Sequence, residues 1–123
     1  MGFDLDGINP ISEKGEYFRA NVWYWRPLWD FVCDNCDDIL NEEDKERGEW
    51  NDWHEITNQK AIQIADRLDD LDKKGKIKDY DNSYKKKMDK LEDGSFKKHY
   101  PFERDFIMEF AKFSRESGGF KIG

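Results

Sequence analysis

The scarcity of aliphatic side chains is the strongest constraint on how this chain can fold. Only six Leu, nine Ile and two Val occur among the 123 residues, while charged residues make up 40% of the chain. This composition lies close to the range in which chains remain disordered. Five Trp, five Tyr and nine Phe offset the deficit, because burying one large ring contributes roughly 1.5–3 kcal/mol. The sequence therefore predicts a folded domain whose core is built mainly from aromatic rings.

Aromatic residues are concentrated in one stretch, NVWYWRPLWDFVCDNC. Because Pro27 disfavours helical geometry in the residue before it and suits the first position of a helix, we expect a helix to begin there. The residues before the helix are then expected to be extended, with Trp23 and Trp25 on one side and Tyr24 on the other. We predict that Trp25 and Trp29 belong to the core and that the remaining rings do not all point into it.

The same stretch also supports a functional interpretation. Trp23, Tyr24 and Arg26 could line a shallow pocket in which a nucleotide-like ligand stacks on the rings and places its phosphate against the guanidinium. The acidic segment that follows, residues 41–52, has no apolar periodicity and is predicted to be a mobile loop. Its candidate contact residues are Asp44, Glu46 and Trp50.

Three further segments show apolar residues at helical spacing. The first expected helix is capped by Thr57 and ends at Gly75. The second follows it and can end at Gly94. The third can run from Pro101 to Gly118. The apolar stripes are Ala61, Ile64, Ala65, Leu68 and Leu71; Ile77, Tyr80, Tyr84, Met88 and Leu91; and Phe102, Phe106, Phe110 and Phe113.

The two ends of the chain alternate apolar and polar residues, as half-buried strands do. Phe3 and Leu5 would share one face near the amino terminus, and GGFKIG repeats the pattern at the other end. Pairing of these strands would set Lys121 near Asp4 and Asp6. The sequence therefore predicts one domain, residues 1–123, with an α-dominant α+β fold of about four helices and short terminal strands paired in a small sheet.

Charge is distributed unevenly along the chain. Residues 1–72 carry 7 basic and 19 acidic side chains, a net charge of −12, whereas residues 73–98 carry 10 Lys and 5 acids. An acidic surface repels nucleic acid and attracts basic protein surfaces, so we expect a protein partner and no direct nucleic-acid binding. The sequence lacks a membrane span and the basic-then-apolar order of a signal peptide, which favours the cytoplasm.

Two motifs suggest metal sites. Cys33 and Cys36 supply half of a zinc site, but the spacings to His54 and His99 match no zinc finger, so free thiols are the favoured interpretation and structural zinc the alternative. No other cofactor is expected.

The segment DLDKKGKIKDYD resembles an EF-hand loop, with Asp70 and Asp72 at the first two ligand positions and Gly75 at the turn. Lys74 stands where calcium needs an oxygen, and Asp81 replaces the usual glutamate. We therefore interpret this segment as a turn between two helices.

Catalytic signatures are lacking. The sequence contains no glycine-rich phosphate loop, no G-x-S-x-G elbow and no H-E-x-x-H helix. We therefore expect a non-enzymatic protein with no catalytic residues.

The runs MGFDLDGINP and GEYFRANVWYWRPLWDFV, followed by ADRL, YPF and SGGF, resemble an uncharacterised family of small proteins encoded mainly by bacteriophages and prophages. The resemblance is strongest over residues 1–32 and returns over residues 100–120. It implies an accessory product that acts in the bacterial host cytoplasm, and it implies no catalytic residue.

Three functions follow as hypotheses. The leading one is a protein that binds and inhibits or redirects a host factor, such as a defence component, through an acidic and aromatic surface. The alternative is a binder of a nucleotide-like small molecule at the Trp23–Arg26 cluster. The third is a small structural zinc-binding domain.

Overall fold

The structure, a computed structural model, describes residues 2–91 and 101–123 of the chain. Its elements in chain order are β1 (Gly2–Gly7), the short 3-10 helix η1 (Glu13–Gly15), β2 (Tyr17–Asn21), α1 (Val22–Asn35), α2 (Glu42–Arg47), β3 (His54–Ile56), α3 (Asn58–Lys73), α4 (Lys76–Asp89), α5 (Arg104–Glu116) and β4 (Phe120–Ile122). The predicted helix-dominant α+β class is confirmed, with four helices of 13–16 residues beside one small sheet. Among the described residues, no helix has both the length and the apolar character needed to cross a bilayer.

The sheet joins the two ends of the chain, as the alternating patterns predict. Its strands are antiparallel in the order β2-β1-β4-β3, and Asp6 in β1 lies opposite Lys121 in β4. Charged residues also pair across the outer face, where Arg19 lies opposite Asp4 and Glu55 lies opposite Lys121. Opposite charges on facing positions stabilise a sheet whose outer face meets water.

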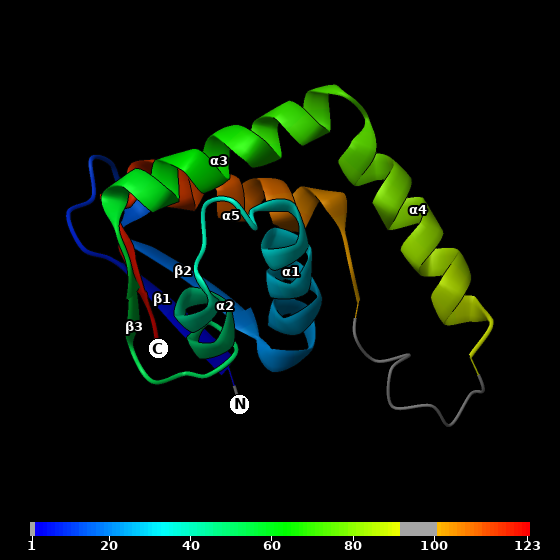
Figure 1. Ribbon diagram of the computed structural model, residues 1–123, viewed down its shortest axis with the longest axis horizontal. Helices are drawn as coiled ribbons and strands as arrows, with labels where there is room; N and C mark the ends of the chain where they lie inside the picture. The colour runs from blue at the N-terminus through cyan, green and yellow to red at the C-terminus, as the bar shows by residue number, and fades with distance from the viewer. Residues whose placement is uncertain (1, 92–100) are drawn as a thin grey trace.

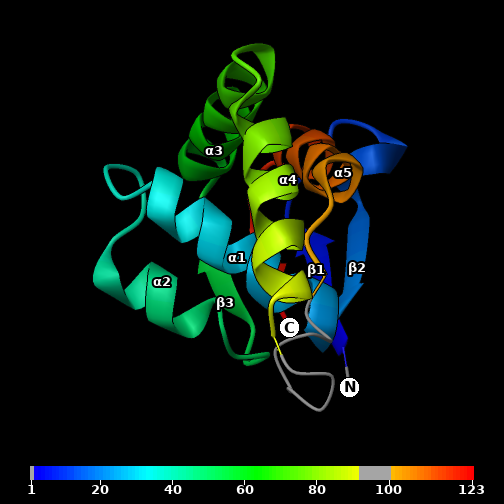
Figure 2. The same cartoon turned by 90° about the vertical axis from the view of Figure 1, so that its right-hand side faces the viewer.

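The inner face of the sheet carries the aromatic core. Helices α1 and α5 contact the sheet, and α3 runs alongside α5 (Figures 1 and 2). Trp25 and Trp29 are fully buried and stack with their ring centres 5.3 Å apart. Trp25 also stacks on Phe3 and meets the edge of Phe110 at 5.9 Å. The prediction that both tryptophans belong to the core and pack near the Phe stripe is confirmed.

Helix α1 begins five residues earlier than predicted. The side chain of Asn21 accepts a hydrogen bond from the backbone N–H of Tyr24, so it caps a helix that starts at Val22 and contains Pro27. A proline in the second turn removes a single intrahelical hydrogen bond, and the cap and the buried tryptophans compensate for that loss. The prediction of an extended segment with Trp23 and Trp25 on one side is therefore wrong.

The remaining helices follow their apolar stripes. Thr57 caps α3 as predicted, accepting a hydrogen bond from the N–H of Lys60, and its five apolar positions are buried. Helix α5 begins at Arg104, three residues after the predicted proline start. The predicted end of the preceding helix at Gly94 lies outside the described residues.

The DLDKKGKIKDYD segment forms the end of α3, a turn and the start of α4, as predicted. Gly75 occupies the turn with a φ of 74°, a left-handed conformation that suits glycine. Helix α4 then runs along one side of the molecule (Figure 1), where the Tyr80 ring packs on Phe31 of α1 with the ring centres 4.8 Å apart. The carboxylates at the would-be calcium positions are engaged by basic side chains: Asp70 by Lys74, Asp72 by Arg104 and Asp81 by Lys85.

The segment predicted to be a mobile acidic loop, residues 41–52, instead contains helix α2. A strand follows it, because His54–Ile56 pairs with β4 at the edge of the sheet. Both elements are short and strongly polar, so neither produces an apolar period long enough to detect.

Candidate functional site

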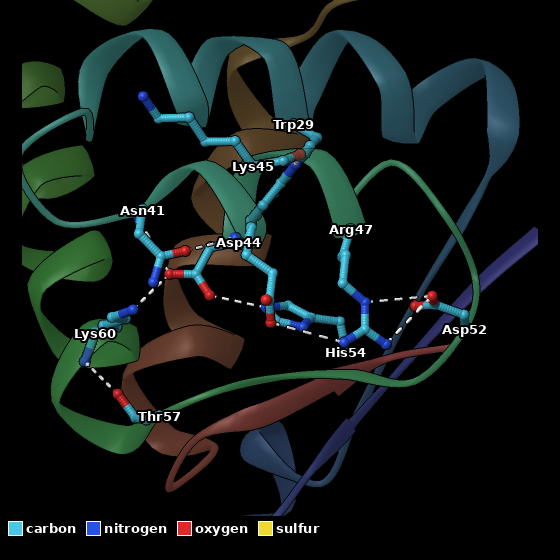
Figure 3. A network of polar contacts seen from close by, with 10 residues as sticks. Trp29, Asn41, Asp44, Lys45, Arg47, Asp52, His54, Thr57 and Lys60 are labelled. Carbon is cyan, nitrogen blue, oxygen red and sulfur yellow. Dashed lines mark hydrogen bonds and ion pairs between the residues drawn. The ribbon is translucent and has the colours of Figure 1, made fainter.

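Helix α2 is fixed by a buried polar network (Figure 3). Asn41 and Asp44 form a capping box, in which each side chain accepts a hydrogen bond from the backbone N–H of the other residue. The Asp44 carboxylate, 4% exposed, also lies 2.8 Å from Nε2 of His54 in β3 and accepts a hydrogen bond from Nζ of Lys60 in α3. One side chain therefore ties α2 to both β3 and α3.

Asp44 is held in its ionised form. Burial disfavours the charge, but hydrogen bonds from Lys60, His54 and the Asn41 backbone outweigh burial and lower the pKa of Asp44 below its usual value. Since its oxygens are already engaged, this carboxylate serves the fold rather than an external ligand.

Two buried tryptophans of α1 hold α2 in place through hydrogen bonds to its backbone. Nε1 of Trp25 donates a hydrogen bond to the Gly48 carbonyl at 2.8 Å, and Nε1 of Trp29 donates to the Lys45 carbonyl at 3.0 Å. A Cβ at Gly48 would lie 2.2 Å from the Trp29 ring, so only glycine allows this close approach. The aromatic stretch thus builds the core and also positions the acidic helix.

A cleft of about 790 Å³ opens between α1, the α2 region and α4. We call it the acidic cleft because carboxylates outnumber cations on its walls. The carboxylates are Asp30, Asp34, Glu42, Glu46 and Glu49, and the cations are Arg26, Lys45 and Lys87. Apolar surface comes from α4, whose Tyr80, Tyr84 and Met88 form one wall. The volume lies within the range of ligand-binding pockets.

The negative charge of the acidic cleft is incompletely neutralised. Lys45 is engaged by Asp37 and Glu42, whereas Asp34, Glu46 and Glu49 form no ion pair with any residue that the structure describes. Partial burial, followed by the nearby charges of Glu49 and Asp34, raises the pKa of Asp30 to about 6.

The residues predicted for a nucleotide pocket do not converge. Trp23 and Tyr24 are half-buried in α1, and the Tyr24 ring packs on Phe106 of α5, with the ring centres 5.3 Å apart. Arg26 lies on another side of the helix, at the acidic cleft. Because α1 is helical through this stretch, neighbouring residues point in different directions.

The contact residues predicted in segment 41–52 also lie in different places. Glu46 lines the acidic cleft, Trp50 is 60% exposed beside Arg26, and Asp44 is buried. Asp30, Asp34 and Glu49 also line the cleft, although none of them was among the predicted contact residues. The i,i+4 spacing of Asp30 and Asp34 was a visible signal, because it places both on one face of a helix.

The CDNC motif lies at the end of α1. Cys33 is half-buried on the cleft wall and Cys36 is fully buried, and both are free thiols. Burial is the main cause that raises the pKa of Cys33 to about 12 and that of Cys36 to about 11. Within residues 2–91 and 101–123, no three His, Cys, Asp or Glu side chains are arranged to hold a metal ion. His99 lies outside that part of the chain.

Comparisons with models of known families, with curated proteins and with solved structures found no match to this chain.

Proposed function

We propose that this chain is a non-enzymatic binding protein whose acidic cleft receives a positively charged segment of a partner protein. The observation that carries the proposal is the excess of negative charge in one cleft, where five carboxylates, among them Asp34, Glu46 and Glu49, face three cations. Their mutual repulsion is relieved when a ligand supplies positive charge, so cation binding gains energy that the free protein lacks.

The aromatic wall suits lysine and arginine side chains. Tyr80 is 36% exposed, and Tyr84 and Met88 lie on the same helix face. Aliphatic stems can pack on these side chains while the charged heads reach the carboxylates opposite, and an aromatic ring attracts a cation directly. A nucleotide phosphate would instead enter a cleft in which five carboxylates outnumber three cations, and this excess of negative charge disfavours the small-molecule alternative.

The phage resemblance supplies the biological context of the proposal. In that context the partner is a host factor with a basic surface, such as a defence component, and binding in the bacterial cytoplasm blocks or redirects it. The uneven charge of the sequence supports this role, because an acidic surface that covers a basic groove competes with nucleic acid for it.

A defined cationic probe tests the proposal. Fluorescence anisotropy would compare labelled hexalysine with labelled hexaglutamate, and only hexalysine should bind, with an affinity that falls as salt rises. The triple variant Asp34→Asn/Glu46→Gln/Glu49→Gln should lose about tenfold in affinity, since each exposed pair contributes roughly 0.5 kcal/mol.

A matched control separates the cleft from overall charge. The triple variant Glu13→Gln/Glu16→Gln/Asp79→Asn removes the same three charges from exposed positions outside the acidic cleft. It should bind hexalysine nearly as well as the wild type. Equal losses in both variants would mean that net charge, and not the cleft, attracts the probe.

A further inference from the structure

A second hollow, of about 270 Å³, adjoins the acidic cleft. We call it the tryptophan hollow, and its walls come from the start of β1, the first turns of α1 and the turn after α2. Its lining residues are Phe3, Val22, Arg26, Glu49, Trp50 and Asn51.

Trp50 leaves a large ring in solvent. Trp25 and Trp29 are fully buried in the core, whereas Trp50 is 60% exposed and Trp53 is 54% exposed. Of these two exposed rings, that of Trp50 lines the tryptophan hollow. Burying such a ring would contribute roughly 1.5–3 kcal/mol, a substantial gain for a chain with few aliphatic residues. Exposed tryptophan beside arginine is typical of the residues that dominate binding energy at protein interfaces.

The backbone around Trp50 is fixed in advance. Its N–H donates a hydrogen bond to the Arg47 carbonyl at 3.1 Å, and the N–H of Glu49 donates to the Glu46 carbonyl at 3.2 Å. The Arg47 guanidinium reaches the Asp52 carboxylate at 3.3 Å and closes the turn (Figure 3). A ring presented on an ordered turn loses little conformational entropy when a partner packs on it.

The tryptophan hollow and the acidic cleft form one continuous surface, because Arg26 and Glu49 line both. We infer that the tryptophan hollow accepts one large apolar side chain of the same partner segment whose basic side chains enter the acidic cleft. This inference rests on the proposed function and narrows the partner to a basic segment with an adjoining aromatic or large aliphatic residue. Phe3, Val22 and Trp50 supply apolar contacts for that residue, and Arg26 can stack on an aromatic ring.

Two matched peptides test the inference. The first is a labelled lysine-rich peptide that contains one tryptophan, and the second has alanine in place of that tryptophan. Wild-type protein should bind the tryptophan peptide about tenfold more tightly. Trp50→Ala should remove this preference while leaving the affinity for the alanine peptide unchanged, and Val22→Gln should reduce the preference by making the opposite wall polar.

Ile11→Ala is the control, because Ile11 is 76% exposed and lies outside the tryptophan hollow. It should keep the full preference for the tryptophan peptide. Equal binding of both peptides by the wild type, or equal losses for both peptides in Trp50→Ala, would overturn the inference and leave the proposed function standing. Binding of neither peptide would overturn the proposed function itself, and this inference with it. Melting temperatures of all variants verify that each is folded, and Val22→Gln decides the question should Trp50→Ala not fold.

Discussion

Oδ2 of Asp81, in α4, accepts a hydrogen bond from the backbone N–H of Arg104, the first residue of α5, at 2.9 Å. Glu103 stands at the N-cap of α5 but its side chain caps no N–H, so Asp81, 23 positions before Arg104, supplies the acceptor instead. Asp81 is 3% exposed and is also paired with Lys85 at 2.7 Å. Because Tyr80 and Tyr84 lie beside it on α4, this contact also sets the aromatic wall of the acidic cleft.

Replacing Asp81 should therefore loosen both the fold and the cleft. Asp81→Ala leaves the first N–H of α5 and the Lys85 ammonium without their acceptor, and we expect a loss of about 2–3 kcal/mol in the free energy of unfolding. Asp79→Ala, at an exposed position two residues earlier, should change the free energy by less than about 0.5 kcal/mol. Urea denaturation measures both. Equal stability of the two variants would contradict the capping role.

The Asp44 network predicts a dependence of stability on pH. Hydrogen bonds lower the pKa of Asp44 in the folded protein, so its stabilisation is fully present above the unfolded value, about 3.9, and is lost as the pH falls through the lower folded value. Asp44→Asn should cost about 2–4 kcal/mol at pH 7. The difference between variant and wild type should shrink below about pH 3.9. Denaturation midpoints from pH 7 to pH 2.5 test this, and a constant difference would rule the linkage out.

For Asp30 we expect the opposite dependence of stability on pH. Its pKa is raised to about 6, first by partial burial and then by Glu49 and Asp34, so the free energy of unfolding should fall as the pH rises from about 4 to 6. Asp30→Asn should therefore raise the denaturation midpoint at pH 7 and leave it unchanged at pH 4.

A cation in the acidic cleft favours the ionised carboxylate, so wild-type protein should bind hexalysine more tightly at pH 7.5 than at pH 5. The same titration with Asp30→Asn should be flatter, and identical profiles would exclude Asp30 as the titrating group.

The cysteines should be unreactive in the folded protein. Burial raises the pKa values of Cys33 and Cys36 to about 12 and 11, so almost no thiolate exists at pH 8, and thiolate is the form that alkylating agents and zinc require. Mass spectrometry after iodoacetamide treatment should find both modified slowly in native protein and rapidly in guanidinium chloride. EDTA should leave the melting temperature unchanged. Rapid labelling of native protein would show that the thiols ionise readily in the fold, and a fall in melting temperature that zinc restores would show that they hold a metal.

Most of the fold could be predicted because long amphipathic elements leave a periodic signal. The stripe from Ala61 to Leu71 and the alternation of Phe3 and Leu5 each report a buried face directly. The earlier start of α1 could not be derived from Pro27 alone, because the Asn21 cap and the burial of Trp25 outweigh the proline penalty.

The acidic cleft was harder to predict because it depends on contacts between distant segments. The six residues of α2 have no apolar period, and the helix is held by its capping box and by indole groups that hydrogen-bond its carbonyls. The Asn41–Asp44 spacing could have signalled the box. By contrast, the approach of Tyr80 to Asp30 depends on how α4 packs, and no local pattern encodes that packing.

The contact between Gly48 and Trp29 gives the sharpest test of how α2 is positioned. Gly48 has a φ of −67°, which alanine adopts without strain, so any effect of Gly48→Ala is steric. The new Cβ would lie 2.2–2.4 Å from three atoms of the Trp29 ring, which is fully buried and cannot move aside. We expect a loss of about 1–3 kcal/mol in the free energy of unfolding. Gly75→Ala is the control, because its Cβ meets nothing within 4 Å and only the backbone strain of its φ of 74° remains.

A double-mutant cycle then isolates the steric term. Trp29→Phe shortens the ring and removes the indole N–H that bonds the Lys45 carbonyl, so alone it should destabilise the protein. In the Trp29→Phe background, however, the Cβ of Gly48→Ala finds the space that the larger ring had filled. The double variant should therefore be more stable than the sum of the single losses predicts, by roughly 0.5–3 kcal/mol. Additive losses would mean that packing on the Trp29 ring does not position α2. Another contact would then have to hold the α2 side of the acidic cleft in place.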